Sequence, residues 1–393
     1  MDKIPILKAS FLEQFECLGD KCEDTCCKGW GMQLEPQKKA LYEKEAPELL
    51  DAVTKGEAEL IMKRDPKTDY CVKFEGGLCG IHKKYGTKFL GDACHFYPRI
   101  TRKLGEVTSM TAALSCPEVS RLALFTENPF TYVESETDRI PTITKNYLED
   151  SSLAGKEAAE VVQSFIEIAL DPSTSAERAM INVISVANSL SAIEKKNWPA
   201  EVKFLGRTAE ARLPQAEPKE TDQLFLVQAL VALIAASKKT DRPRLDETVK
   251  SIEEALAIHI HRENFSIMKK TKADQYPALQ AKWKKSAANK AAPILKKWLA
   301  AQLSMASFPF AGFGKDMKER ATILGVRFAT VRLALMANMT KDGSVPDDTT
   351  VVKITQSLAR FLDHLADPTF SMLSYTEAGW VDEARIRALL GDF

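Results

Sequence analysis

The sequence has no cysteine beyond residue 116, no net charge and no long apolar run. Its 54 basic and 54 acidic side chains cancel, so the chain as a whole has no electrostatic attraction to nucleic acid, and we expect no nucleic-acid partner. The opening residues, MDKIPILKASFLEQF, are interspersed with charges and contain no apolar stretch of signal-peptide length. The longest apolar run, residues 224–236, contains Gln228 and would span about 20 Å as a helix, short of the roughly 30 Å of a bilayer core. We therefore expect a cytoplasmic protein.

Nucleotide-binding motifs are also missing. The glycine-containing stretches EGGLCG (75–80) and FAGFGKD (310–316) match neither the GxGxxG turn nor the P-loop. A radical S-adenosylmethionine loop, C-x3-C-x2-C, would fit Cys22 and Cys26 but needs a third cysteine where Gly29 stands. These absences argue against Rossmann-type enzymes and against the radical S-adenosylmethionine superfamily.

The pattern of apolar residues predicts a mainly α fold. From residue 157 onward apolar positions recur at helical spacing, for example within 161–169, 324–339 and 354–362. Alternation with period two is confined to short stretches at 73–82 and 103–112. We expect a cysteine-rich metal-cluster module with little β structure at 1–125, a connection at 126–156, and an all-helical domain at 157–393.

Cysteine is concentrated in the first third of the chain. The eight cysteines are Cys17, Cys22, Cys26, Cys27, Cys71, Cys79, Cys94 and Cys116. In a reducing compartment, clustered thiols favour metal or redox chemistry over structural disulfides. Zinc knuckles are usually paired, and only Cys22-x3-Cys26 fits one easily, so irregular spacings favour four thiolates around one [4Fe–4S] cluster. Zinc and a redox disulfide stay as alternatives, and His82 or His95 could replace one thiolate.

Three further features of the helical region lead to predictions: a histidine pair, an arginine–histidine pair and a basic stripe. We expect His259 and His261 on opposite sides of a helix. We expect Arg360 with His364 on a solvated helix face, and a functional surface is the alternative. Residues 262–298 contain ten basic and two acidic side chains, interleaved with Tyr276, Trp283 and Trp298. We expect this stripe to be a solvated face; peripheral membrane contact or binding of an acidic partner is the alternative.

Four stretches carry a resemblance to a known family. They are FECLGDKCEDTCCKGWGMQLE (15–35), CVKFEGGLCGIHKKYG (71–86), LGDACHFYPRI (90–100) and ALSCPEVSRLAL (113–124). Together they resemble the flagellin lysine-N-methylase family, with an N-terminal module similar to the CxxCxxCC zinc- or iron-chelating proteins. The chelating module's spacing is expanded here to x4 and x3, so Cys17 is the ligand with least support.

The resemblance implies a protein-lysine methyltransferase. It implies S-adenosylmethionine as methyl donor, flagellin as protein substrate, a helical domain that shapes the cleft, and an iron–sulfur cluster held by four of the eight cysteines. The alternative function is a non-enzymatic metal-binding or electron-transfer module whose helical part docks a partner.

Lysine methylation requires a proton acceptor and a site for a cationic cofactor. Freeing the lone pair of a solvated lysine at pH 7 costs roughly 4.6 kcal/mol. Among the residues near the cysteines, His95 or Tyr97 could accept the proton. Trp30 offers an aromatic face to the sulfonium, and Arg99 offers a guanidinium to the cofactor carboxylate. Packing is the alternative role for each of the four.

Overall fold

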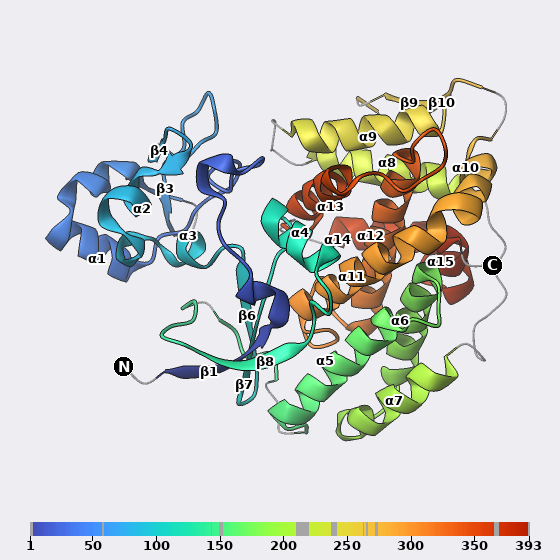
Figure 1. The fold of residues 1–393 in the computed structure, drawn as a ribbon, viewed down its shortest axis with the longest axis horizontal. Coiled ribbons are helices and arrows are strands. Elements are labelled where there is room, and N and C mark those ends of the chain that lie inside the picture. The colour runs from blue at the N-terminus through green and yellow to red at the C-terminus, as the bar shows by residue number, and fades with distance from the viewer. Residues whose placement is uncertain are drawn as a thin grey trace.

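The structure is a computed structural model of the 393-residue chain. It describes residues 3–56, 59–142, 144–148, 152–209, 220–236, 242–261, 263–264, 266–271, 274–364 and 369–391. Figure 1 shows a small lobe of short helices and hairpins, a twisted sheet beside it, and a larger helical body.

The small lobe has its own apolar core. Its elements are α1 (Pro36–Glu45), β2 (Val53–Lys55), β3 (Leu60–Met62), β4 (Phe74–Glu75), β5 (Leu78–Cys79), α2 (Gly80–Tyr85) and α3 (Asp92–Phe96). Proline at the first position starts α1, where its missing N–H costs nothing. The Tyr42 ring stacks on Phe89 with centroids 6.3 Å apart, and its hydroxyl donates to the Phe89 carbonyl at 2.7 Å. This buried contact ties α1 to the chain just before α3.

A four-stranded sheet joins the small lobe to the helical body. The strands, in the order β6–β7–β1–β8, are β6 (Arg99–Leu104), β7 (Val107–Ala112), β1 (Ile4–Ala9) and β8 (Tyr132–Thr137). Strands β6 and β7 form a hairpin that turns at Gly105, where φ is +56°. Strand β1 is parallel to β7 and antiparallel to β8. The first 125 residues thus contain more β structure than predicted, and β8 lies in the segment expected to be a connection.

The helical body contains twelve α-helices in the described residues. They are α4 (Pro117–Phe125), α5 (Gly155–Leu170), α6 (Ala176–Leu190), α7 (Trp198–Thr208), α8 (Glu220–Ala236), α9 (Pro243–Ala255), α10 (Tyr276–Lys282), α11 (Ala288–Ala306), α12 (Met317–Ala337), α13 (Asp348–Leu362), α14 (Thr369–Glu377) and α15 (Glu383–Leu390). The three predicted helices are confirmed as parts of α5, α12 and α13. Searching the described chain finds no helix with the length and apolar character needed to cross a membrane.

Helix α12 is the central helix of the body. It packs against α6, α9, α13 and α15, and it is buried on nearly every side. The Asp316 carboxylate accepts the Glu319 N–H at its start, as Asp347 accepts the Thr350 N–H at the start of α13. These caps fix where two of the longest buried helices begin.

The C-terminal region is not entirely helical, because β9 (Ile258–His261) and β10 (Ser266–Lys269) form an antiparallel hairpin. The sequence IHIH alternates: Ile258 and Ile260 are buried, while His259 and His261 are exposed. The prediction of a helix with these histidines on opposite sides is therefore wrong. Over these four residues, the alternation of buried and exposed side chains is that of a strand and not of a helix.

The basic stripe at 262–298 does not present its aromatic residues. Tyr276, Trp283 and Trp298 are all buried. The Trp283 indole N–H donates to Glu177 at 3.2 Å inside the helical body. Peripheral membrane contact through this stripe stays a prediction, without a contribution from these three buried rings.

A cysteine-lined cavity as the candidate active site

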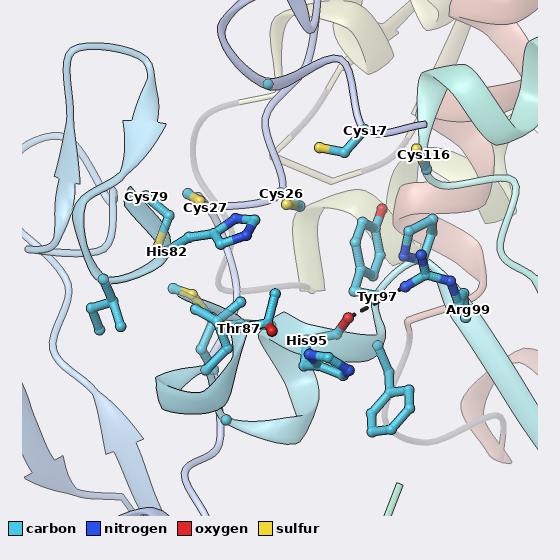
Figure 2. Close-up of a pocket in the computed structure, with 18 of the residues that line it drawn as sticks. Cys17, Cys26, Cys27, Cys79, His82, Thr87, His95, Tyr97, Arg99 and Cys116 are labelled. Atoms are coloured by element: carbon cyan, nitrogen blue, oxygen red, sulfur yellow. Dashed lines mark hydrogen bonds between the residues drawn. The ribbon is translucent and has the colours of Figure 1, made fainter. Parts of the chain in front are cut away.

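All eight cysteines line one cavity of about 670 Å³ between the small lobe, the sheet and the start of α4. Trp30, His95, Tyr97 and Arg99 line the same cavity, as does His82. Figure 2 shows Cys27 and Cys79 on one side of it, Cys17 and Cys116 on the other, and Cys26 between them. None of the eight thiols is in a disulfide. Segments as distant as Cys17 and Cys116 are thus brought to one place.

Four of the cysteines, the inner thiols, belong to the small lobe: Cys27, Cys71, Cys79 and Cys94. The Cys71 N–H donates to the Cys27 carbonyl at 2.9 Å. Cys71, Cys79 and Cys94 pack with the apolar core of the small lobe. Burial raises the pKa of Cys94, and negative charge on Cys79, Cys27 and Cys71 raises it further. Burial also raises the pKa values of Cys71 and Cys79, and a bound cationic centre would favour the thiolate form of all four.

The outer thiols, Cys17, Cys22, Cys26 and Cys116, lie toward the helical body. Burial raises the pKa of Cys116 to about 12, with Cys22 and Cys17 as charged neighbours. The Cys22 thiol donates to the Asp24 carbonyl at 3.4 Å. The thiol of Cys26 interacts with both groups, through Cys27 and Cys94 on one side and Cys17 on the other.

The donor chemistry fits a metal centre, whereas the present spacing of the side chains does not preform one. Within the described residues, no three or more His, Cys, Asp or Glu side chains form a group that could hold a metal ion. Binding would therefore have to draw the thiolates inward from the cavity wall. The cluster and its ligands stay predictions.

The adjacent pair Cys26 and Cys27 gives a pH-dependent prediction. A hydrogen bond from Cys26 lowers the pKa of Cys27 to about 7 despite burial. A thiol with that pKa is half ionised at pH 7, whereas the Cys116 thiol is ionised to roughly one part in 10⁵. The lower nucleophilicity of the more acidic thiolate offsets part of this difference. In chelator-treated protein at pH 7, iodoacetamide should therefore alkylate Cys27 on the order of 100-fold faster than Cys116.

Peptide mass spectrometry at pH 6, 7 and 8 measures both rates. Because the Cys27 pKa is depressed, its rate should fall below pH 7 and level off above it. Cys26→Ser serves as the control for the hydrogen bond, because a serine hydroxyl is a different donor and should shift the midpoint. Equal rates at Cys27 and Cys116 would contradict the assignment.

Helix α3 is held by a buried carboxylate. Asp92 at its first turn accepts Arg139 Nη2 at 2.8 Å on one oxygen and the N–H and hydroxyl of Thr142 on the other. The Asp92 N–H in turn donates to Glu35. This clamp fixes Cys94 and His95, which α3 carries into the cavity wall.

The imidazole of His95 is suited to accept a proton. Burial lowers its pKa, and the positive charges of Arg139 and Arg99 lower it further, so the ring is neutral at neutral pH. Its Nδ1 is buried and has no hydrogen-bond partner among the described residues. A neutral imidazole with an uncommitted nitrogen is what a general base requires.

An aromatic pair and a guanidinium lie along the same wall. The rings of Trp30 and Tyr97 have centroids 6.0 Å apart, and the Trp30 indole N–H donates to the Cys26 carbonyl at 2.6 Å. The Arg99 guanidinium lies 5.5 Å from the Phe15 ring centroid and donates to the His95 carbonyl at 3.4 Å. The structure thus brings together all four predicted non-cysteine site residues; their catalytic and cofactor roles stay predictions.

Helix α13 contributes Gln356, which the sequence analysis did not name, and Arg360, which it placed on a solvated face. Arg360 forms an ion pair with Asp24 and donates to the Lys28 carbonyl at 2.7 Å. Gln356, fully buried, donates to Asp24 Oδ2 at 2.7 Å and to the Ser115 carbonyl at 3.0 Å. The prediction that Arg360 faces solvent is therefore wrong, because this helix face covers the cysteine loop. The signal in the sequence was Gln356, a polar residue among the apolar positions of α13, which indicates a buried hydrogen-bond partner.

Comparisons with known proteins identify a family. A family model, the FliB lysine N-methylase C-terminal domain, matches residues 162–382. The flagellar biosynthetic protein FliU of Salmonella muenchen is 26% identical over 168 residues, covering 38% of this chain and 95% of FliU. A lysine-N-methylase of Salmonella typhimurium is 25% identical over 135 residues, covering 30% of this chain and 32% of the methylase.

The lysine-N-methylase of Salmonella choleraesuis is also 25% identical over 135 residues. The matches to the two methylases thus span about a third of their length. No solved structure matches the chain. The family match covers residues 162–382, whereas the motifs behind the predicted resemblance lie before residue 125, outside the matched range.

Proposed function

The chain belongs to the FliB lysine N-methylase family, and we propose that it methylates lysine side chains of flagellin with S-adenosylmethionine as methyl donor. The observation that carries the proposal is a cavity lined by eight free thiols together with a neutral imidazole, an aromatic pair and a guanidinium. Its volume of about 670 Å³ lies within the range that small-molecule cofactor sites occupy.

The cavity wall offers the contacts that a sulfonium cofactor needs. The faces of Trp30 and Tyr97 can stabilise its positive charge, since cations are attracted to aromatic rings. Arg99 can pair with the cofactor's carboxylate through its guanidinium. The proton that the substrate lysine must lose can pass to the Tyr97 hydroxyl or to His95, which is neutral because of burial and two nearby arginines.

The inner thiols would hold a [4Fe–4S] cluster. Their support is the core that Cys71, Cys79 and Cys94 share, the electrostatic interaction of Cys94 with the other three, and the backbone hydrogen bond between Cys27 and Cys71. A bound cluster would supply electron transfer or rigid shape to the cavity. Zinc on the same thiolates is the alternative metal.

Anaerobic incubation of the protein with flagellin and S-adenosylmethionine labelled in its methyl group tests this function. Label should appear on flagellin lysines, located by peptide mass spectrometry. Flagellin whose lysines have been blocked by acetylation is the matched control and should stay unlabelled. A brown protein that neither transfers label nor binds S-adenosylmethionine would contradict the proposal and favour an electron-transfer module.

A further inference from the structure

A chain of hydrogen bonds leads from the cavity to the far side of the junction between sheet and helical body. The Tyr97 hydroxyl, at the cavity wall, lies 3.2 Å from Ser115 Oγ. The same Ser115 oxygen lies 3.0 Å from His364 Nε2. Ser115 is buried with 2% of its surface exposed, whereas His364, just after α13, is exposed.

We propose that Tyr97, Ser115 and His364 form a proton relay that carries the proton lost by the substrate lysine from the cavity to solvent. This inference rests on the proposed function, because the relay has a purpose only where an ammonium group must be deprotonated. It adds Ser115, which precedes Cys116 in one of the family motifs, and His364, which the sequence analysis placed on a solvated helix face; neither is among the described residues that line the cysteine cavity.

The proton balance is complete without any further reactant. The ammonium N–H bond of the lysine breaks as a proton passes to the Tyr97 oxygen. Tyr97 gives its own hydroxyl proton to Ser115 Oγ, and Ser115 gives its proton to the lone pair of His364 Nε2. The imidazolium then releases a proton to water. The lysine is left with the lone pair that attacks the methyl group, and both hydroxyls are regenerated after they rotate back.

The surroundings of Tyr97 suit a hydroxyl that passes protons without ionising. Burial raises the pKa of Tyr97 well above its usual value, and the Cys116 thiol raises it further. The other charged groups near it are Cys26, which acts in the same sense, and Arg360, which opposes them. Tyr97 therefore stays a neutral phenol, which can accept on its oxygen while donating its proton.

Histidine is the residue that exchanges protons with water near neutral pH. His364 lines a second cavity of about 130 Å³, whose charged residues are Arg102, Arg320, Arg327 and Asp363. Within this group Asp363 is paired to Arg327 at 3.0 Å. Ser115 is held in place from the other side, since its carbonyl accepts Gln356.

The relay is tested by removing the His364 imidazole and restoring it with free imidazole in solution. His364→Ala should lower the rate of methyl transfer by about 100-fold, the lower end of general acid–base effects. Added imidazole should restore most of that rate, and the restoration should follow the fraction of unprotonated imidazole as pH changes. Ser115→Ala should lower the rate similarly without rescue. The control is His259→Ala, on the exposed β9–β10 hairpin, which should leave the rate unchanged.

A second readout does not depend on turnover. The relay requires His364 Nε2 to carry a lone pair, so the neutral ring should be the Nδ1–H tautomer. Long-range ¹H–¹⁵N NMR of histidine-labelled protein shows the tautomer, and His364→Asn assigns the signal. An Nε2–H tautomer at pH 8 would overturn the relay.

The outcomes separate the two claims. A wild-type protein that methylates flagellin, with His364→Ala equally active, overturns the relay alone. A loss of activity in His364→Ala that imidazole does not restore also overturns it, in favour of a structural role. A wild-type protein with no methyl transfer under any condition overturns the proposed function and the relay with it.

Discussion

Cys94→Ser should yield a protein without iron–sulfur absorption and with methyl transfer lowered on the order of 100-fold or more. Mutation of a residue that only supports a metal ligand typically lowers metal affinity or activity 10- to 100-fold. Loss of a ligand itself should therefore have a larger effect. Cys94 sits on α3, clamped by the buried Asp92 carboxylate, and interacts electrostatically with the other three inner thiols. Its replacement would leave a cluster held by the inner thiols one thiolate short.

The matched control is Cys17→Ser. Cys17 is an exposed outer thiol, and it lies on the opposite side of the cavity from Cys27 and Cys79 in Figure 2. Absorption near 400 nm and iron content after anaerobic purification should be close to wild type in this variant. If Cys94→Ser kept its iron while Cys17→Ser lost it, the assignment of the inner thiols would be wrong.

Arg332→Met should reduce the free energy of unfolding by about 3–5 kcal/mol, the usual result of removing one partner from a buried ion pair. Arg332 is 1% exposed, and its Nε donates to Glu177 Oε1 at 2.7 Å. The same guanidinium donates to the Tyr276 hydroxyl at 3.3 Å and to Gln280. Methionine fills much of the space but leaves the Glu177 carboxylate buried without a cation.

Urea denaturation followed by circular dichroism measures this loss. The double variant Arg332→Met/Glu177→Leu should recover part of it, because the unpaired carboxylate is then gone. Lys353→Met breaks the exposed pair with Glu247 at 2.9 Å and should cost less than about 1 kcal/mol. An Arg332→Met protein as stable as Lys353→Met would show that the buried network contributes little.

Local signals in the sequence were sufficient for the helices and for the concentration of thiols. Helical spacing of apolar residues identified parts of α5, α12 and α13, because each buries one or more faces along its whole length. The clustering of cysteine before residue 117 predicted that they would meet, and they line one cavity. The family expected from the cysteine motifs is confirmed by a match over the helical body.

Long-range pairings were not predictable from local pattern. Strand β1 lies between β7 and β8, and neither β1 nor β8 shows a clear alternation of apolar and polar residues. The contact of Gln356 with Asp24 joins residues 332 positions apart, so no local window contains it. The prediction for His259 and His261 was wrong for a different reason. A stretch of four residues is too short to distinguish the alternation of a strand from the spacing of a helix.

The most direct test of the central claim is the metal content of the anaerobically purified wild-type chain, measured by iron, acid-labile sulfide and zinc analysis together with Mössbauer spectroscopy. Thiolates converging on one inorganic centre in the cysteine-lined cavity predict four irons and four sulfides per chain. Stoichiometric zinc in a colourless protein, or cystines without metal, would contradict it.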